Sequence, residues 1–126
     1  MISLSGVHHV KLPVSDVERS RRWYQRTIGL TTDIEFVEDG VLQGVALAGS
    51  GSASIALRHD PVRAAALSGF DALALAVPNR DDIPPLAGPA RRVDEPYGDI
   101  VTGHHGGSVL VRLHDPDGIE IRLYAD

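Results

Sequence analysis

Hydrophobic residues recur at every second position near the start of the chain. Within residues 6–14, valine and leucine at positions 10, 12 and 14 alternate with polar residues or proline, which is the period of a half-buried β-strand. One face of this strand is therefore hydrophobic. The other face carries His9 and Lys11.

A helix is predicted directly after this strand. Ser15 can cap it, and Glu18, three residues later, can reach back to complete a capping box. Glu18 and Arg22 are four positions apart and are expected to pair on the exposed side. Val17, Tyr24 and Ile28 lie at helical spacing and mark the buried side, and Trp23 adjoins them. Gly29 is expected to end the helix.

Three strands are then predicted before the middle of the chain. They are Thr31–Glu38, Gly40–Ala48 and Ser52–Arg58. Asp39-Gly40 is typical of a tight hairpin turn, and the glycines of residues 49–51 indicate another turn. Residues 59–69 are interpreted as a connection with a helical turn at 61–67.

The second half of the chain repeats this order. A strand is predicted over Phe70–Val77, followed by a helix over Asn79–Leu86 that Pro84-Pro85 cuts short. The remaining elements are a strand near Ala90–Glu95, a loop at 96–107, strands at Ser108–His114 and Ile119–Ala125, and a turn between those two. The last two strands are expected to pair as a hairpin. The chain thus contains two strand–helix–three-strand modules, residues 1–58 and 70–126.

Two runs of sequence carry a family resemblance. The run from His9 to Asp16, with Trp23-Tyr24 and Ile28-Gly29-Leu30 after it, resembles the opening of the vicinal oxygen chelate superfamily of glyoxalases, bleomycin-resistance proteins and extradiol dioxygenases. The run Asp115–Tyr124 resembles the end motif of that superfamily. The resemblance spans nearly the whole chain and implies a single α+β domain. In it, two βαβββ modules form a curved mixed sheet with a cup inside and helices outside.

The resemblance leaves the assembly of the cup open. The two half-sheets of such proteins pair either within one chain or across a dimer. An isolated half-sheet would expose an unpaired edge, which is a liability for a folded protein. A homodimer is therefore expected.

The resemblance also implies where a metal would bind. The superfamily uses up to four cup-facing positions, and here they are occupied by His9, Ala56, Ala72 and Arg122. Alanine offers no donor atom, and a guanidinium would repel a cation. Because divalent metals need several nitrogen or oxygen ligands, we expect no metal and no other cofactor.

Strand parity predicts which side chains face the cup. The ligand-binding residues expected from parity are Lys11, Ser54, Arg58, Arg122 and Tyr124, and the loop residues His104 and His105 are further candidates, of which at most one would face the cup if the loop were a regular strand. Arg122 would attract an anionic group such as a carboxylate, unless Glu120, two residues away on the same face, neutralises it. The simpler alternative is that Glu120 and Arg122 form a solvated surface pair of little energetic value.

The histidines also have two interpretations each. His9 is either a packed ring or a general base, because imidazole exchanges protons near neutral pH; with Glu120 it is the candidate for catalysis. His8 is expected to point toward the helix and to be structural. His104 and His105 lie in the glycine-rich stretch 97–107 and either close over a ligand or sit in an exposed loop.

Composition narrows the range of functions. The chain has 126 residues, no cysteine and a net charge of −5, which excludes thiol catalysis and disfavours nucleic-acid binding. No hydrophobic run is long enough to cross a bilayer, and no signal peptide is evident, so a cytoplasmic protein without a membrane partner is expected.

Three functions remain from the sequence. The first is a metal-free binding protein that sequesters a drug or metabolite, as in the bleomycin-resistance branch. The second is a metal-independent lyase, isomerase or cyclase that uses His9 and Glu120 as acid and base. The third is a metalloenzyme of the glyoxalase or dioxygenase kind with unusual donors, such as His9 with His104 or His105.

Overall fold

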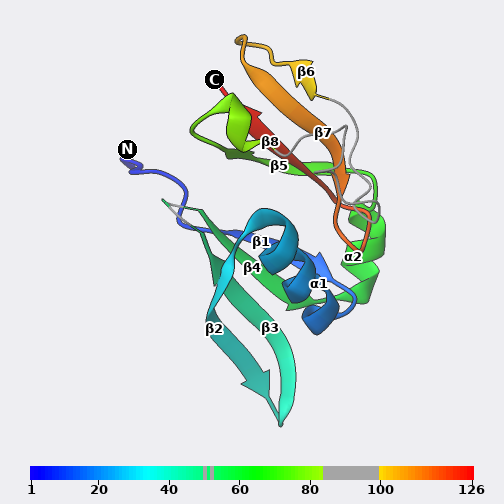
Figure 1. The fold of residues 1–126 in the computed structure, drawn as a ribbon. Coiled ribbons are helices and arrows are strands. Elements are labelled where there is room, and N and C mark those ends of the chain that lie inside the picture. Colours follow the sequence, from blue (N-terminus) through cyan, green and yellow to red (C-terminus); the bar gives the residue numbers. More distant parts are fainter. Residues whose placement is uncertain (50, 52, 84–99) are drawn as a thin grey trace. The chain divides into compact units, whose positions relative to one another are not determined.

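The structure is a computed structural model that describes residues 1–49, 51, 53–83 and 100–126 (Figure 1). These residues form two compact units, Met1–Ala66 and Leu67–Asp126. Each unit contains one four-stranded mixed sheet. No helix in the described part of the chain is long and apolar enough to span a membrane.

The first unit is a βαβββ module. Its elements are β1 (Val10–Val14), α1 (Val17–Trp23), a π-helical turn (Tyr24–Ile28), β2 (Thr31–Glu38), β3 (Val41–Ala48), β4 (Ser54–His59) and α2 (Pro61–Leu67). The strand order is β1-β4-β3-β2. The first and last strands of the module, β1 and β4, run parallel, whereas β4, β3 and β2 are antiparallel neighbours.

The second unit repeats this topology. It contains β5 (Asp71–Ala76), a 3₁₀ turn (Arg80–Asp82), β6 (Ile100–Thr102), β7 (Ser108–His114) and β8 (Glu120–Ala125). The strand order β5-β8-β7-β6 matches that of the first sheet, and β5 is again parallel to β8. The predicted α+β fold of two repeated modules is confirmed, as is the β7–β8 hairpin.

The hydrophobic core of the first unit lies between α1 and one face of its sheet. On β4, Ile55 and Leu57 are buried, and their partners on β3, Leu47 and Val45, are buried as well. Trp23 packs edge-on against Tyr24 with ring centroids 4.8 Å apart, and both rings are buried. Because side chains alternate along a strand, the intervening residues project from the opposite face of the sheet.

The start of α1 corrects one prediction. Asp16, not Ser15, is the N-cap, and its side chain accepts a hydrogen bond from the Arg19 backbone N–H at 3.0 Å. Because the helix begins one residue later than predicted, Glu18 does not complete a capping box, and it pairs with Arg21 instead of Arg22. The predicted end is confirmed, since Gly29 has φ 83° and donates to the carbonyls of Tyr24 and Gln25.

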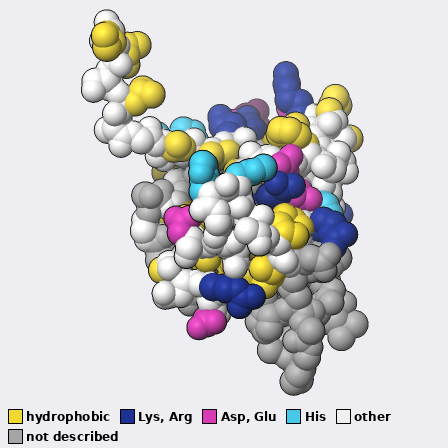
Figure 2. Space-filling view, turned by 90° about the horizontal axis from the view of Figure 1, so that it is seen from above, with side chains coloured by type: hydrophobic (Ala, Val, Ile, Leu, Met, Phe, Trp, Pro, Cys, Tyr) yellow, Lys and Arg dark blue, Asp and Glu magenta, His cyan; other side chains and the backbone are white. Residues whose placement is uncertain are grey.

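Residues before β1 differ from the predicted strand. The strand begins at Val10, and the start of the chain protrudes from the surface with hydrophobic side chains exposed (Figure 2). Those side chains are Met1, Ile2, Leu4 and Val7. The alternation of residues 6–9 therefore does not continue into a hydrogen-bonded strand.

Two loop regions show where turn chemistry was informative and where it was not. Asp39 and Gly40 have φ of 51° and 76°, as a two-residue hairpin turn with both central residues left-handed requires.

The stretch predicted as a loop at 96–107 contains β6, which pairs with β7. The helix predicted over Asn79–Leu86 is a 3₁₀ turn where it is described. The strand predicted near Ala90–Glu95 lies outside the described residues.

Candidate functional site

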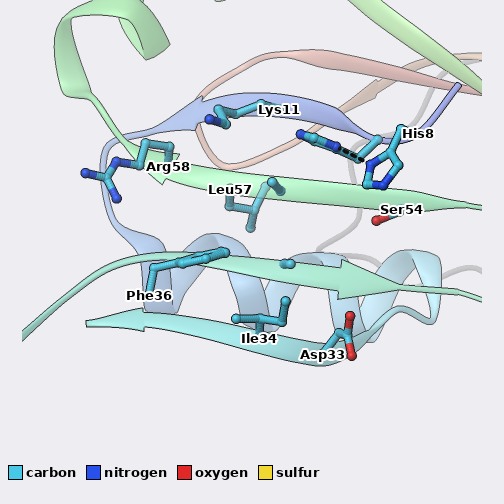
Figure 3. Close-up of a pocket in the computed structure, with 11 residues that line it drawn as sticks. His8, Lys11, Asp33, Ile34, Phe36, Ser54, Leu57 and Arg58 are labelled. Atoms are coloured by element: carbon cyan, nitrogen blue, oxygen red, sulfur yellow. Dashed lines mark hydrogen bonds between the residues drawn. The ribbon is translucent and has the colours of Figure 1, made fainter. Parts of the chain in front are cut away.

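A pocket of about 360 Å³ lies on the face of the first sheet that α1 leaves open (Figure 3). Its polar lining residues are His8, His9, Lys11, Asp33, Ser54 and Arg58. Its apolar lining residues are Ile34, Phe36, Ala46, Ala56 and Leu57. The pocket therefore combines a hydrophobic base with several polar side chains, the composition typical of small-molecule sites.

Strand register explains how the pocket forms. Ala56 is the Cα partner of Lys11 on β1 and of Ala46 on β3, so two small side chains lie side by side in the middle of the sheet. Gly44 lies in register between Phe36 and Arg58 and has no side chain to fill the space there. Small residues at the centre leave a hollow that longer side chains surround.

His8 and His9 form a pair at one end of the pocket. Their Nδ1 atoms are 2.8 Å apart, and their rings are edge-on with centroids 5.1 Å apart. One Nδ1–H must therefore donate to the other Nδ1. The prediction that His8 points to the helix is wrong, because the alternation of a strand does not hold before Val10.

The two cations of the pocket differ in their pairing. Arg58 binds Glu38 through two parallel hydrogen bonds of 3.0 Å each. The hydrogen bond from Arg58 lowers the pKa of Glu38 below its ordinary value of 4.5, and the same bond raises the pKa of Arg58. Lys11 makes no ion pair within the described residues, and Asp33 makes none there either.

Charge is thus distributed unevenly along the pocket. Lys11 and Arg58 lie toward one end, whereas His8, Ser54 and Asp33 lie toward the other (Figure 3). Ile34 from β2 lies between the two ends, whereas Phe36, which is in register with Arg58 through Gly44, lies at the end of Lys11 and Arg58. The side chain of Arg58 is already neutralised by Glu38, so Lys11 supplies the uncompensated positive charge.

Sequence reasoning missed the contribution of β2. Asp33 and Ile34 are adjacent, yet both line the pocket. The register of β2 against β3 shifts between Thr32 and Ile34, and such an irregularity turns an extra side chain toward the same face. Ile34 and Phe36 are hydrophobic residues two positions apart in a predicted strand, and this spacing could have placed both on the pocket face.

The four positions of the family's metal site do not suit a divalent metal in this chain. His9 and Ala56 lie in the pocket of the first unit, and Ala72 lies at a register shift of β5. Arg122, on β8, is bonded to carboxylates. Within the described residues, no group of three or more histidine, aspartate or glutamate side chains is arranged to hold a metal.

The predicted pair of Glu120 and Arg122 forms a small charged cluster in the second unit. Arg122 Nε donates to Glu120 Oε2 at 2.6 Å, and Arg122 Nη1 lies 3.2 Å from Asp71 Oδ2. The hydrogen bond to Glu120 raises the pKa of Arg122. Glu120 is only 7% exposed, whereas the side chain of Arg122 is 39% exposed, so solvent reaches the guanidinium but hardly the Glu120 carboxylate. Arg122 is neutralised within its own unit.

Tyr124 fastens the loop that carries His104 and His105. Its hydroxyl donates to the Gly106 carbonyl at 2.7 Å, and both histidines are exposed.

The predicted ligand-binding residues are divided between the two units. His104, His105, Tyr124 and Arg122 lie in the second unit, while His9, Lys11, Ser54 and Arg58 share the pocket of the first. Their roles as ligand-binding residues stay predictions.

Gly103→Ala is expected to release this loop. A Cβ at position 103 would lie 2.0 Å from the Tyr124 hydroxyl oxygen, so the ring must move and its hydrogen bond breaks, at a cost of about 1 kcal/mol. Urea unfolding and the amide exchange of residues 103–107 measure the effect. Tyr124→Phe, which loses the bond without a clash, is the control. Unchanged exchange in Gly103→Ala would mean that the loop does not pack on Tyr124.

Comparison with known proteins gives the class of this chain. A model of the glyoxalase/bleomycin resistance protein/dioxygenase superfamily matches residues 6–123. The chain therefore belongs to that superfamily. No curated protein matches it closely enough to be reported.

Solved structures share the fold at low sequence identity. A glyoxylase/bleomycin resistance protein/dioxygenase domain from Frankia sp. EAN1pec has a TM-score of 0.70 and 23% identity, covering 98% of this chain and 93% of that one. TnmS3, an antibiotic binding protein from Streptomyces sp. CB03234, has a TM-score of 0.73 and 20% identity, with 99% and 98% covered. The fosfomycin resistance protein FosX from Listeria monocytogenes has a TM-score of 0.67 and 13% identity, with 98% and 95% covered.

Proposed function

We propose that this protein binds a small organic molecule in the pocket of its first unit, without a divalent metal. The observation that carries the proposal is the pocket of about 360 Å³ with an apolar base and polar side chains at both ends. Hollows of this size and composition are the usual sites for small ligands. The similarity to TnmS3, described as an antibiotic binding protein, supports a binding or sequestering role. In this proposal the protein is a cytoplasmic homodimer.

A second candidate is a metal-independent lyase, isomerase or cyclase. The hydrogen-bonded pair of His8 and His9 favours it, because two imidazoles that share a proton can transfer one to or from a bound substrate. Glu120, the other candidate for proton transfer, accepts a hydrogen bond from Arg122. Chemical conversion of a molecule that binds the pocket would favour this candidate over simple binding.

The pocket can be blocked with one substitution. Ala56 is partly exposed in the middle of the pocket, so Ala56→Trp fills the hollow without entering the core. Ala65→Trp, on the exposed side of α2, is the matched control. A panel of uncharged, anionic and cationic aromatic compounds is screened by thermal shift, and hits are measured by calorimetry.

Binding of a hit is expected to raise the stability of the wild type and of Ala65→Trp by about 2.7 kcal/mol when the free concentration is a hundred times Kd. Ala56→Trp is expected to show no such rise. Equal binding by all three proteins would place the ligand elsewhere and refute the proposal.

The purified protein is expected to carry less than one equivalent of divalent metal. Alanine stands at the second and third family positions, and Arg122 at the fourth is bonded to Glu120 and Asp71. Elemental analysis of the wild type and of His9→Ala tests this expectation. Stoichiometric zinc, iron or nickel that disappears in His9→Ala would contradict the metal-free assignment.

A further inference from the structure

We infer, building on the proposed function, that the pocket recognises an elongated aromatic molecule with an anionic group at one end and a cationic group at the other. The anionic group would meet Lys11, the ring would lie against Phe36, and the cationic group would meet Asp33. The inference rests on three features of the pocket: its unpaired charges, its exposed hydrophobic side chains and the distance between its ends.

Lys11 is the group available to an anion. It makes no ion pair within the described residues, whereas Arg58 is held by both oxygens of Glu38. A ligand carboxylate can approach Lys11 without displacing a protein partner. To engage Arg58 it would have to compete with Glu38, which presents the same bidentate geometry.

Asp33 is the matching group at the other end. It also makes no ion pair within the described part of the chain, and Ser54 lies at the same end of the pocket (Figure 3). The pair of His8 and His9 adds hydrogen-bonding groups there. The hydrogen bond between them occupies both Nδ1 atoms, so their Nε2 atoms are the ones that a ligand could meet. This end therefore suits an ammonium or another multiple donor.

Phe36, at the end of Lys11 and Arg58, and Ile34, between the two ends, supply exposed hydrophobic surface in the pocket. They are 42% and 48% exposed, although both face the pocket. A flat ring placed on Phe36 would cover this surface and gain the offset or edge-on contact that aromatic pairs prefer. Burying exposed hydrophobic surface is favourable at about 25 cal/mol per Å².

The separation of the ends sets the length of the ligand. Lys11 on β1 is the Cα partner of Ala56 on β4, Ala56 is the partner of Ala46 on β3, and Ala46 is the partner of Ile34 on β2, next to Asp33. Three strand spacings of about 4.8 Å place the backbones of Lys11 and Asp33 roughly 14 Å apart. A single benzene ring with two substituents is too short to span this distance. Two linked rings with a polar group at each end have a suitable length.

The test uses four biphenyls that differ only in their end groups. They are 4′-(aminomethyl)biphenyl-4-carboxylate, biphenyl-4-carboxylate, 4-(aminomethyl)biphenyl and biphenyl-4-carboxamide. Calorimetry at pH 7 with the wild-type protein is expected to give the lowest Kd for the first compound and the highest for the carboxamide. Equal Kd values for all four would contradict the charge assignment.

Variants assign each end. Lys11→Gln is expected to weaken the two carboxylates about tenfold, the effect of losing one charged hydrogen bond, and to leave the amine-only compound unchanged. Asp33→Asn is expected to weaken the two amines about tenfold and to leave biphenyl-4-carboxylate unchanged. If a variant weakens the binding of all four compounds by the same factor, the residue affects the shape of the pocket and does not distinguish ligand charge.

Glu38→Gln provides a gain of affinity as a further readout. It keeps the size of the side chain but removes the anion that holds Arg58, so Arg58 becomes available to a ligand carboxylate. Both carboxylates are expected to bind about threefold more tightly, within the range for exposed ion pairs, and Arg58→Gln should remove the gain. An unchanged Kd would contradict the role of Glu38 as a competitor.

The proposed function and this inference fail differently. If the four probes bind equally and Ala56→Trp abolishes all binding, the pocket is a ligand site but the charge assignment is wrong. If no probe binds while a compound from the broader panel does and is lost in Ala56→Trp, the inferred ligand class is wrong and the proposed function stands. If Ala56→Trp changes nothing for any ligand, the proposed function itself fails.

Discussion

Replacing Asp115 by alanine is expected to destabilise the fold by about 3 kcal/mol. Asp115 is 4% exposed, and its Oδ1 accepts hydrogen bonds from the backbone N–H groups of Asp117 and Ile119 at 2.9 and 3.0 Å. Hydrogen bonds to a charged group contribute about 1.5–3 kcal/mol each, and alanine leaves the Ile119 N–H buried without this acceptor. The turn between β7 and β8 depends on these bonds.

Asp115→Asn is the matched control, because its amide oxygen can accept the same two bonds without the charge. Urea unfolding followed by circular dichroism gives the free energy of unfolding of wild type and both variants. Asn is expected to retain more than half of the stability that Ala loses. If Asp115→Ala unfolds at the wild-type urea concentration, the turn does not depend on this side chain.

Arg122→Leu is expected to cost about 2 kcal/mol, because the nearly buried Glu120 carboxylate loses a charged hydrogen bond, while the 39% exposed side chain of Arg122 leaves the pair partly screened by solvent. The Glu120 side chain is 9% exposed and lies 2.6 Å from Arg122 Nε. Leucine keeps the hydrophobic contacts of the arginine stem but provides no donor. Among the residues that the structure describes, the carboxylate of Glu120 then retains His114, whose Nε2 lies 3.7 Å from Glu120 Oε1.

Two further variants isolate the ion pair. The double variant Glu120→Gln/Arg122→Leu removes both charges and is expected to recover more than half of the loss. Arg63→Leu breaks an exposed pair with Asp60 at 2.7 Å and is expected to cost less than about 1 kcal/mol. Urea unfolding again measures each change. Equal losses for Arg63→Leu and Arg122→Leu would contradict the burial of Glu120.

The repeat and most of the strands could be predicted because hydrophobic period and turn chemistry agree along this chain. Asp39-Gly40 has the residues that the left-handed turn requires. β6 was hidden because Ile100–Thr102 is a three-residue strand beside a glycine-rich loop. Such a short segment carries too little periodicity to be distinguished from a loop.

The site was harder to predict where the backbone departs from regular strands. Parity grouped His9, Lys11, Ser54 and Arg58 on one face, and the structure brings them to one pocket. Parity gave the wrong side for His8, which precedes the strand. It also missed Asp33, because the register of β2 shifts beside that residue.

The ion pairs between side chains could not be predicted from the sequence either. The bidentate contact of Arg58 with Glu38 joins residues twenty positions apart and depends on the ends of β2 and β4 lying near each other. From the sequence, Arg58 and Lys11 were equivalent cations. In the described part of the structure, Arg58 is neutralised by Glu38, whereas Lys11 makes no ion pair. This difference determines which of the two an anionic ligand would meet.

A crystal structure of the protein grown with the tightest-binding compound of the panel tests the central claim most directly. The account predicts electron density for the compound on the open face of the first sheet, in contact with Phe36 and within hydrogen-bond distance of Lys11 Nζ, with no metal ion beside His9. Density for the compound at another surface, with this pocket filled only by water, would contradict it.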